Sequence, residues 1–150
     1  PVIGELITEV LFSMFDGASR IQGDPESWTP EVAELYGKPL YDNGNAKAPL
    51  AMMRMVPDGP NHFSADAMRK IGDYVKTLDI PAEIVWGMND PILGLGLKAM
   101  QENFPKAPVT QTDGGHFLQE EVPAEIAEAL IKVIDKVNNK DMVLINPLQD

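Results

Sequence analysis

The sequence has 150 residues, of which 44% are apolar, and a formal net charge of −11 from 12 basic and 23 acidic side chains. The apolar content indicates a packed globular domain, and the negative charge with scattered Lys and Arg argues against a nucleic-acid partner. Because the chain has no Cys and only two His, disulfides and a Cys nucleophile are excluded, and no structural metal site is expected.

The sequence carries no targeting or membrane signal. No apolar run approaches the roughly 20 residues of a transmembrane helix, so no membrane association is expected. The opening stretch PVIGELITEVLF has two Glu and no basic residue, unlike a secretory signal peptide, which favours a cytoplasmic location. The chain begins with Pro1 and not with Met, which indicates a fragment or a processed product.

The first half of the chain is predicted to be mostly helical. Apolar residues recur at spacings of three and four between Gly4 and Phe15, which predicts a helix. A second helix is expected to have Thr29 as its N-cap, a proline in its first turn, and its end at Gly37. Residues 38–63 are rich in Pro, Gly and Asn and predict irregular structure. Ser64 is expected to cap a further helix, whose apolar face would be Met68, Ile71, Val75 and Leu78.

From Asp79 onward the pattern changes to alternating strands and helices. Short β-rich runs predict strands at Ile84–Trp86 and Val109–Thr112, with a helix at Leu95–Asn103 between them. A last helix is expected to start at Pro123, with an apolar stripe of Ile126, Leu130, Val133 and Val137. This order is typical of an α/β protein with a parallel sheet, in which the intervening helix forms the crossover.

We therefore predict three regions: a helical region at 1–78, an α/β region at 79–138, and a terminal tail at 139–150. Two short strands cannot form a stable parallel sheet alone, because both edges and most of their apolar faces would be exposed. Either the first eighty residues contain strands that the pattern does not reveal, or protein outside this chain completes the sheet.

Two titratable side chains follow the two predicted strands at the same distance. Asp90 lies four positions after Trp86, and His116 lies four positions after Thr112. The carboxyl ends of adjacent parallel strands share one edge of the sheet, so Asp90 and His116 are expected to meet there. A carboxylate that holds an imidazole forms the acid–base part of a nucleophilic triad. The alternative is that both are ordinary turn residues, as we expect for His62.

The residues around this pair resemble a known family. The stretches WGMNDPILG and DGGHFLQEEVP are similar to the C-terminal part of haloalkane dehalogenases, within the α/β-hydrolase superfamily. Upstream, PVIGEL, YGKPLYD and PLAMMRMVP resemble the helical cap of that family. The resemblance covers about residues 1 to 137. It implies the C-terminal part of an α/β-hydrolase fold, preceded by a mostly helical cap at 1–78.

The resemblance also implies roles for particular residues. Asp90 would be the catalytic acid and His116 the general base, while Phe117 and Leu118 would line an apolar substrate pocket. The nucleophile of the family is an Asp on a strand-to-helix elbow that precedes the cap, and this sequence has no such elbow and no G-x-S-x-G. The substrate would be small and apolar, with no cofactor or metal, and this chain alone would lack the nucleophile.

Alternatives remain open at this stage. The same acid–base pair serves epoxide hydrolases and esterases, and Tyr36 and Tyr41 would be candidate proton donors to an epoxide. Trp28 and Trp86 are expected to be packing residues. The non-catalytic alternative is a truncated domain that self-associates. The expected partner is accordingly either the N-terminal half of the hydrolase domain or a second copy of this chain.

Overall fold

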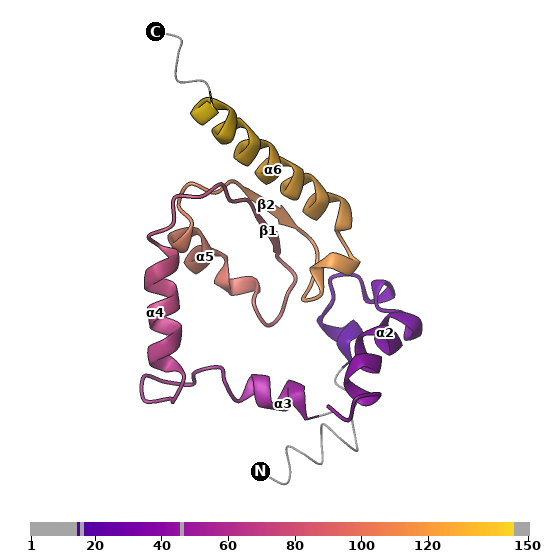
Figure 1. Ribbon diagram of the computed structural model, residues 1–150. Helices are drawn as coiled ribbons and strands as arrows, with labels where there is room; N and C mark the ends of the chain where they lie inside the picture. Colours follow the sequence, from indigo (N-terminus) through magenta and orange to yellow (C-terminus); the bar gives the residue numbers. More distant parts are fainter. Residues whose placement is uncertain (1–14, 16, 46, 146–150) are drawn as a thin grey trace.

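The computed structural model describes residues 15, 17–45 and 47–145, with side chains described as far as residue 139 (Figure 1). The helix expected at Gly4–Phe15 and the PVIGEL similarity therefore lie outside the described residues, apart from Phe15 itself.

The α/β part is organised around two parallel strands. Strand β1 (Ile84–Gly87) pairs with β2 (Val109–Thr112), with Ile84 opposite Val109 and Gly87 opposite Thr112. The connection contains a 3₁₀ turn at Gly94–Gly96 and helix α5 (Leu97–Asn103). The predicted parallel pair and its helical crossover are therefore confirmed. The described residues between 15 and 83 contain no strand, so the strands sought in the first eighty residues are not found there.

Helix α6 (Pro123–Ile145) lies along the two strands, on the side opposite α5 (Figure 1). Its contact face is turned relative to the predicted stripe: Ala129 is buried, whereas Leu130 is 59% exposed. Lys136, seven positions after Ala129 and so on the same face of the helix, forms an ion pair of 2.5 Å with Glu83, the residue before β1. Leu130 and Val137 lie on the exposed side of the helix. The helix also continues to Ile145, so part of the predicted tail at 139–150 is helical.

The helical part begins with 3₁₀ helices at Ala18–Ile21 and Pro25–Ser27, followed by helix α2 (Pro30–Tyr41). The hydroxyl of Thr29 accepts a bond of 3.3 Å from the Val32 amide, as its predicted N-cap role requires. The predicted end at Gly37 is wrong, because the helix runs on to Tyr41. Gly37 is buried, and a Cβ there would lie 2.8 Å from the Tyr41 ring, so this glycine makes room for a ring and does not end the helix.

Helices α3 (Ala48–Met53) and α4 (Ala65–Val75) complete the described helical part. Helix α3 falls in the segment predicted to be irregular, so that prediction is wrong for these residues. Ser64 precedes α4 as expected, but its hydroxyl donates to the Met55 carbonyl at 2.6 Å and does not cap the helix. The Ser64 hydroxyl therefore closes the preceding loop, between Met55 and Ser64.

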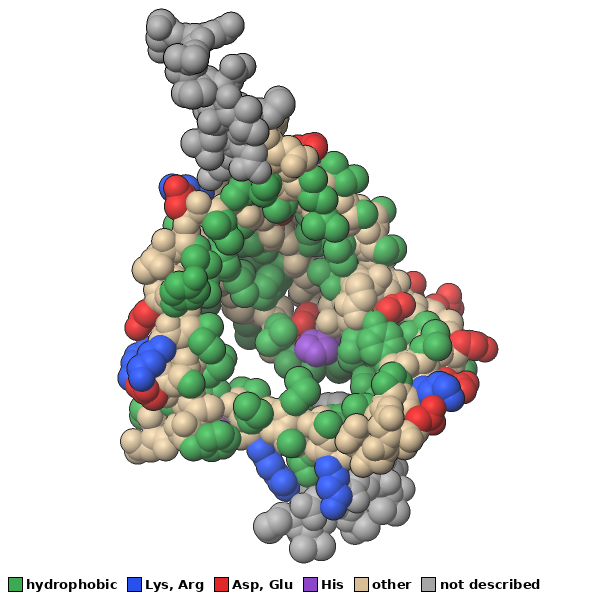
Figure 2. Space-filling view, viewed as in Figure 1, with side chains coloured by type: hydrophobic (Ala, Val, Ile, Leu, Met, Phe, Trp, Pro, Cys, Tyr) green, Lys and Arg blue, Asp and Glu red, His purple; other side chains and the backbone are tan. Residues whose placement is uncertain are grey.

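The buried core is small. Its apolar members in the described part are Ala18, Trp28, Ile84, Leu97 and Ala129. Large apolar side chains of α3, α4 and α6 are exposed, and Figure 2 shows hydrophobic side chains around an opening between the helical and α/β parts. In the described part of the chain, no helix combines the length and the apolarity needed to cross a bilayer.

Candidate active site

The loops that follow β1 and β2 remain joined beyond the ends of the strands. The Met88 amide donates to the Thr112 carbonyl at 2.9 Å, and the Asn89 amide donates to the Gly114 carbonyl at 3.1 Å. The Asn89 side chain adds a bond of 2.7 Å to the Asp113 carbonyl. These bonds carry the strand pairing into the two loops and bring the residues after each strand together.

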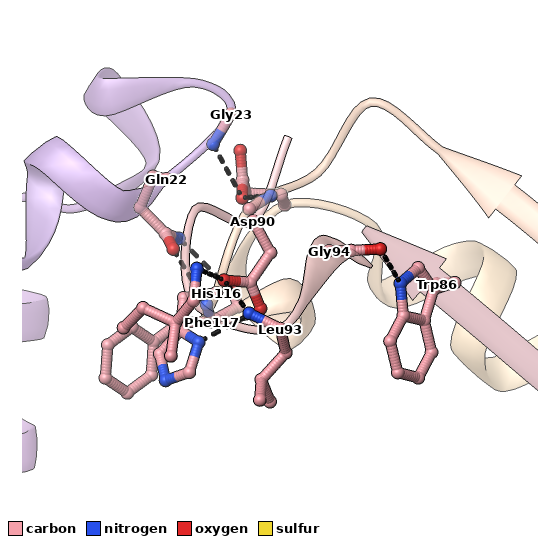
Figure 3. A network of polar contacts seen from close by, with 11 residues as sticks. Gln22, Gly23, Trp86, Asp90, Leu93, Gly94, His116 and Phe117 are labelled. Atoms are coloured by element: carbon pink, nitrogen blue, oxygen red, sulfur yellow. Dashed lines mark hydrogen bonds and ion pairs between the residues drawn. The ribbon is translucent and has the colours of Figure 1, made fainter. Parts of the chain in front are cut away.

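Asp90 and His116 meet at this edge of the sheet (Figure 3). His116 Nδ1 lies 3.0 Å from Asp90 Oδ2. The other carboxylate oxygen, Oδ1, accepts the Ile92 amide at 2.7 Å and the Leu93 amide at 3.0 Å. Both oxygens of Asp90 are thus engaged, one by its own turn and one by the imidazole, which fixes the direction in which the carboxylate points.

The electrostatics of Asp90 favour the ionised carboxylate. Its side chain is only 8% exposed, and this burial opposes ionisation. The hydrogen bonds from the Leu93 and Ile92 amides and from His116 outweigh burial, so the pKa of Asp90 is lowered. An ionised carboxylate can only accept, so Nδ1 of His116 carries a proton, and in the neutral ring Nε2 then has the lone pair. His116 is 26% exposed, and no described residue hydrogen-bonds to Nε2, so this nitrogen is accessible to a bound water or ligand.

The glycines around the histidine allow close backbone packing. A Cβ on Gly87 would lie 2.6 Å from the Gly114 carbonyl oxygen and 2.7 Å from that of Gly115. A Cβ on Gly115 would overlap the backbone of Gln22 and Gly23. Neither Gly114 nor Gly115 has a positive φ, so close approach, and not left-handed backbone, explains the Gly-Gly pair.

Phe117 joins an aromatic cluster between the α/β part and the helical part. Its ring centroid lies 4.4 Å from that of Trp28 and 5.4 Å from that of Tyr36, and Phe15 completes the cluster. Trp28 is buried and donates its indole N–H to the Phe15 carbonyl at 2.8 Å, which supports its predicted packing role. Phe117 therefore attaches the histidine loop to the helical part, and its contact with substrate stays a prediction.

Two surface hollows lie elsewhere. One of about 910 Å³ is at the opposite end of the strands, between residues 76–82, residues 103–107 and α6. Another of about 580 Å³ lies beside Asn89, Asp113 and Glu121. Neither is lined by Asp90, His116, Phe117 or Leu118. Neither hollow therefore accounts for the predicted substrate contacts of Phe117 and Leu118, which stay predictions.

Tyr36 is occupied by its own hydrogen bonds. Its hydroxyl donates to Glu120 at 2.6 Å and accepts from Gln119 at 2.6 Å. Burial, followed by the bond to the Glu120 carboxylate, raises the pKa of Tyr36. A hydroxyl whose proton is held by a carboxylate is poorly placed to donate it to an epoxide. Among the described residues, no group of three or more His, Asp and Glu side chains is arranged to hold a metal ion.

Nothing in the sequence pointed to two residues that hold the loop around His116. Gln22 bonds to the backbone of Phe117, and Glu121 bonds to the amide of Gly115. Gln22 is separated from Phe117 by 95 positions in the chain, and no local pattern marks such a contact. Only its occurrence between two glycine-containing turns could have drawn attention to it.

Comparison with known proteins finds relatives of low sequence identity. The chain is 28% identical over 105 residues to a haloalkane dehalogenase of Mycobacterium marinum, and 28% identical over 99 residues to haloalkane dehalogenase 1 of Mycobacterium bovis. It is 24% identical over 122 residues to a haloalkane dehalogenase of Psychrobacter cryohalolentis. These matches cover 68%, 64% and 79% of the chain. No protein-family model and no solved structure matches it significantly.

These relatives support a distant relation of the chain to haloalkane dehalogenases and to hydrolases of the α/β-hydrolase kind. The matched region spans only 35%, 33% and 40% of the length of the three relatives. The small parallel sheet with flanking helices is compatible with the α/β-hydrolase relation.

Proposed function

We propose that this chain carries the acid and the base of a haloalkane dehalogenase-like hydrolase, with Asp90 as the acid and His116 as the base. The observation that supports this most directly is the 3.0 Å contact between His116 Nδ1 and Asp90 Oδ2 at the carboxyl ends of adjacent strands. The names of the relatives add the carbon–halogen bond as the bond to be cleaved. The nucleophile is an Asp carboxylate outside these 150 residues.

In this mechanism the Asp nucleophile displaces halide from the substrate carbon and forms an alkyl-enzyme ester. His116 Nε2 takes a proton from a water molecule as that water attacks the ester carbonyl. Asp90 stabilises the imidazolium that results. The ester bond then breaks, releasing the alcohol and restoring the carboxylate, so one haloalkane and one water give one alcohol, one halide ion and one proton. Phe117 and Leu118 would line the apolar side of the pocket, and no cofactor or metal is used.

The test is turnover by the complete gene product of 1-bromobutane, styrene oxide and p-nitrophenyl butyrate. We expect bromide release, and negligible turnover of the epoxide and the ester. His116→Ala should still release up to one bromide per enzyme and then stop, because the ester forms but is not hydrolysed. His62→Ala is the matched control, since His62 contacts Ser64 and Phe63 and lies outside the Asp90 contact. The 150-residue chain by itself should release no bromide.

Other outcomes identify the alternatives. Diol formation from styrene oxide without bromide release would make the protein an epoxide hydrolase, and ester turnover alone would make it an esterase. Continued multiple turnover by His116→Ala would remove His116 from the mechanism altogether.

A second candidate function is a non-catalytic domain that self-associates. The observation that favours it is the exposed apolar surface of α4 (Met68, Ile71 and Tyr74) and of α6 (Leu130, Ile131 and Ile134). Light scattering of the 150-residue chain over a range of concentrations measures this directly. A dimer mass together with no turnover of any of the three substrates by the complete gene product would favour the non-catalytic candidate.

A further inference from the structure

We propose that Gln22, in the helical part of the chain, is a positioning residue that sets the orientation of the His116 imidazole. Its consequence for catalysis rests on the proposed function, whereas its effect on the imidazole can be measured without any substrate. The backbone on both sides of His116 is held by residues that are far away in the chain.

The peptide groups flanking His116 are bonded to one short segment of the helical part. The His116 amide donates to the Ile21 carbonyl at 2.8 Å. The next amide, that of Phe117, donates to Gln22 Oε1 at 2.8 Å, and Gln22 Nε2 donates to the Phe117 carbonyl at 3.2 Å (Figure 3). Three hydrogen bonds thus hold the two residues, which leaves the backbone at His116 little freedom to rotate.

The side chain of Gln22 is suited to this task. It is only 7% exposed, and a third bond of 3.1 Å to the Ser27 hydroxyl fixes its own position. A primary amide offers a donor and an acceptor side by side, which matches the N–H and C=O groups of one residue. A carboxylate at position 22 would lack the donor, and an aliphatic side chain would leave both Phe117 groups without this partner.

A second contact prevents the two segments from separating. The Glu121 carboxylate accepts the Gly115 amide at 2.5 Å, next to the histidine, and the Asp24 amide at 2.5 Å, next to the Gln22 segment. It also accepts the Gly23 amide at 3.2 Å. One carboxylate therefore joins the residue before His116 to the residues after Gln22.

These contacts make the direction of the imidazole depend on the helical part of the chain. The 3.0 Å contact with Asp90 requires the His116 side chain to leave a backbone held at a fixed angle. Without the Gln22 hydrogen bonds, the loop after β2 can rotate about His116, and the ring then departs from Asp90. Misplacing a reacting group by about 1 Å lowers a rate by up to about 100-fold.

The experiment compares Gln22→Met with Gln119→Met in the 150-residue chain. Methionine has the length of glutamine and tolerates burial, so the first change removes the hydrogen bonds with little change in volume. Gln119 lies three positions after His116 and bonds to the Tyr36 hydroxyl, outside the contacts that hold His116. The readout is the long-range ¹H–¹⁵N spectrum of the imidazole, at a pH where the ring is neutral, which reports whether Nδ1 carries the proton.

We expect Nδ1–H in the wild-type chain and in Gln119→Met, and a mixture of both tautomers in Gln22→Met. In the complete gene product, Gln22→Met should lower the rate of ester hydrolysis by about 10- to 100-fold while leaving the first bromide release unchanged. A thermal midpoint that falls while the His116 spectrum stays the same would mean that Gln22 is merely structural, and would overturn the proposal.

Two further measurements cover the case in which Gln22→Met does not fold. Glu121→Gln removes the charge that joins Gly115 to Asp24, and we expect it to shift the His116 signals in the same direction. In the wild-type chain, the Phe117 amide should exchange with solvent more slowly than that of the exposed loop residue Asn61. Equal exchange at these two amides would overturn the proposal without any variant. If the tautomer depends on Gln22 but no substrate is turned over, the proposed function fails and the positioning role stands.

Discussion

Replacing Asp90 by asparagine tests the acid–base pair with the least disturbance of the fold. The Asp90 Oδ1 bonds to the Ile92 and Leu93 amides can be kept by the asparagine carbonyl oxygen. The change is therefore confined to the second oxygen, Oδ2, which an NH₂ group replaces opposite His116 Nδ1. Two donors then face each other unless the imidazole moves its proton to Nε2, where the base needs its lone pair.

The magnitude has two parts. The substitution removes a charge-assisted hydrogen bond of 3.0 Å at a carboxylate that is only 8% exposed, so solvent screens this bond little. Such bonds contribute about 1.5–3 kcal/mol, which corresponds to about 10- to 150-fold in the rate of the step that forms the imidazolium. The rate falls further if the imidazole adopts the Nε2–H tautomer, in which Nε2 has no lone pair to accept a proton. In a Ser-His-Asp protease, the same substitution lowers kcat about 10⁴-fold for this reason. We expect a loss between about 10²- and 10⁴-fold in ester hydrolysis.

The assay is quenched-flow measurement of bromide and butanol from 1-bromobutane with the complete gene product. Bromide should appear at the wild-type rate up to one equivalent, and butanol should appear slowly. Asp113→Asn is the matched control, because it neutralises a carboxylate in the loop after β2 that has no described bond to His116. Butanol formation by Asp90→Asn within threefold of the wild-type rate would refute the assignment of Asp90 as the acid.

Three further predictions concern stability. Because the folded-state pKa of Asp90 is lowered, its contribution to stability is present above the unfolded-state pKa of about 3.9 and is lost as the pH falls through the folded value. Urea unfolding of the wild-type chain and of Asp90→Asn should therefore differ most at neutral pH and converge as the pH falls below about 3.9, and a constant difference would contradict this. Gly115→Ala should lower the free energy of unfolding by about 1–3 kcal/mol, because its Cβ overlaps the backbone of Gln22. Gly17→Ala, with open space at that position, should stay within about 0.5 kcal/mol, and equal losses would refute the packing argument. Trp28→Ala should cost about 3–5 kcal/mol by the same measurement, since the buried indole joins Phe15, Tyr36 and Phe117, and a loss below 1 kcal/mol would show that this cluster does not support the fold.

The α/β part could be predicted closely because its signals are local. The β-branched run at Ile84 and the turn residues after it define β1, and the same holds for β2. Two strands separated by one helix favour a parallel crossover, so the sequence predicted that Asp90 and His116 would meet, and the structure brings them together.

The helical part was predicted less well because its signals have more than one meaning. Gly37 has the form of a helix end, yet it is a site where a ring packs closely. Ser64 has the form of a cap, yet its hydroxyl bonds to Met55. The deciding contacts are with the Tyr41 ring, four positions after Gly37, and with the Met55 carbonyl, nine positions before Ser64, and the propensity of the glycine or the serine itself reveals neither.

The sequence by itself predicted the two strands, the crossover helix and the pairing of an acid with a histidine, because each depends on elements that directly follow one another in the chain. It also indicated that the two short strands need further cover, from other strands of the chain or from protein outside it, since they cannot cover their own faces. Only the tertiary structure decided which side of α6 contacts the strands and what holds the histidine in place. The contacts that join Gln22 to Phe117 and Glu121 to Asp24 link residues nearly a hundred positions apart. Such contacts arise from packing between elements and leave no periodic trace in the sequence.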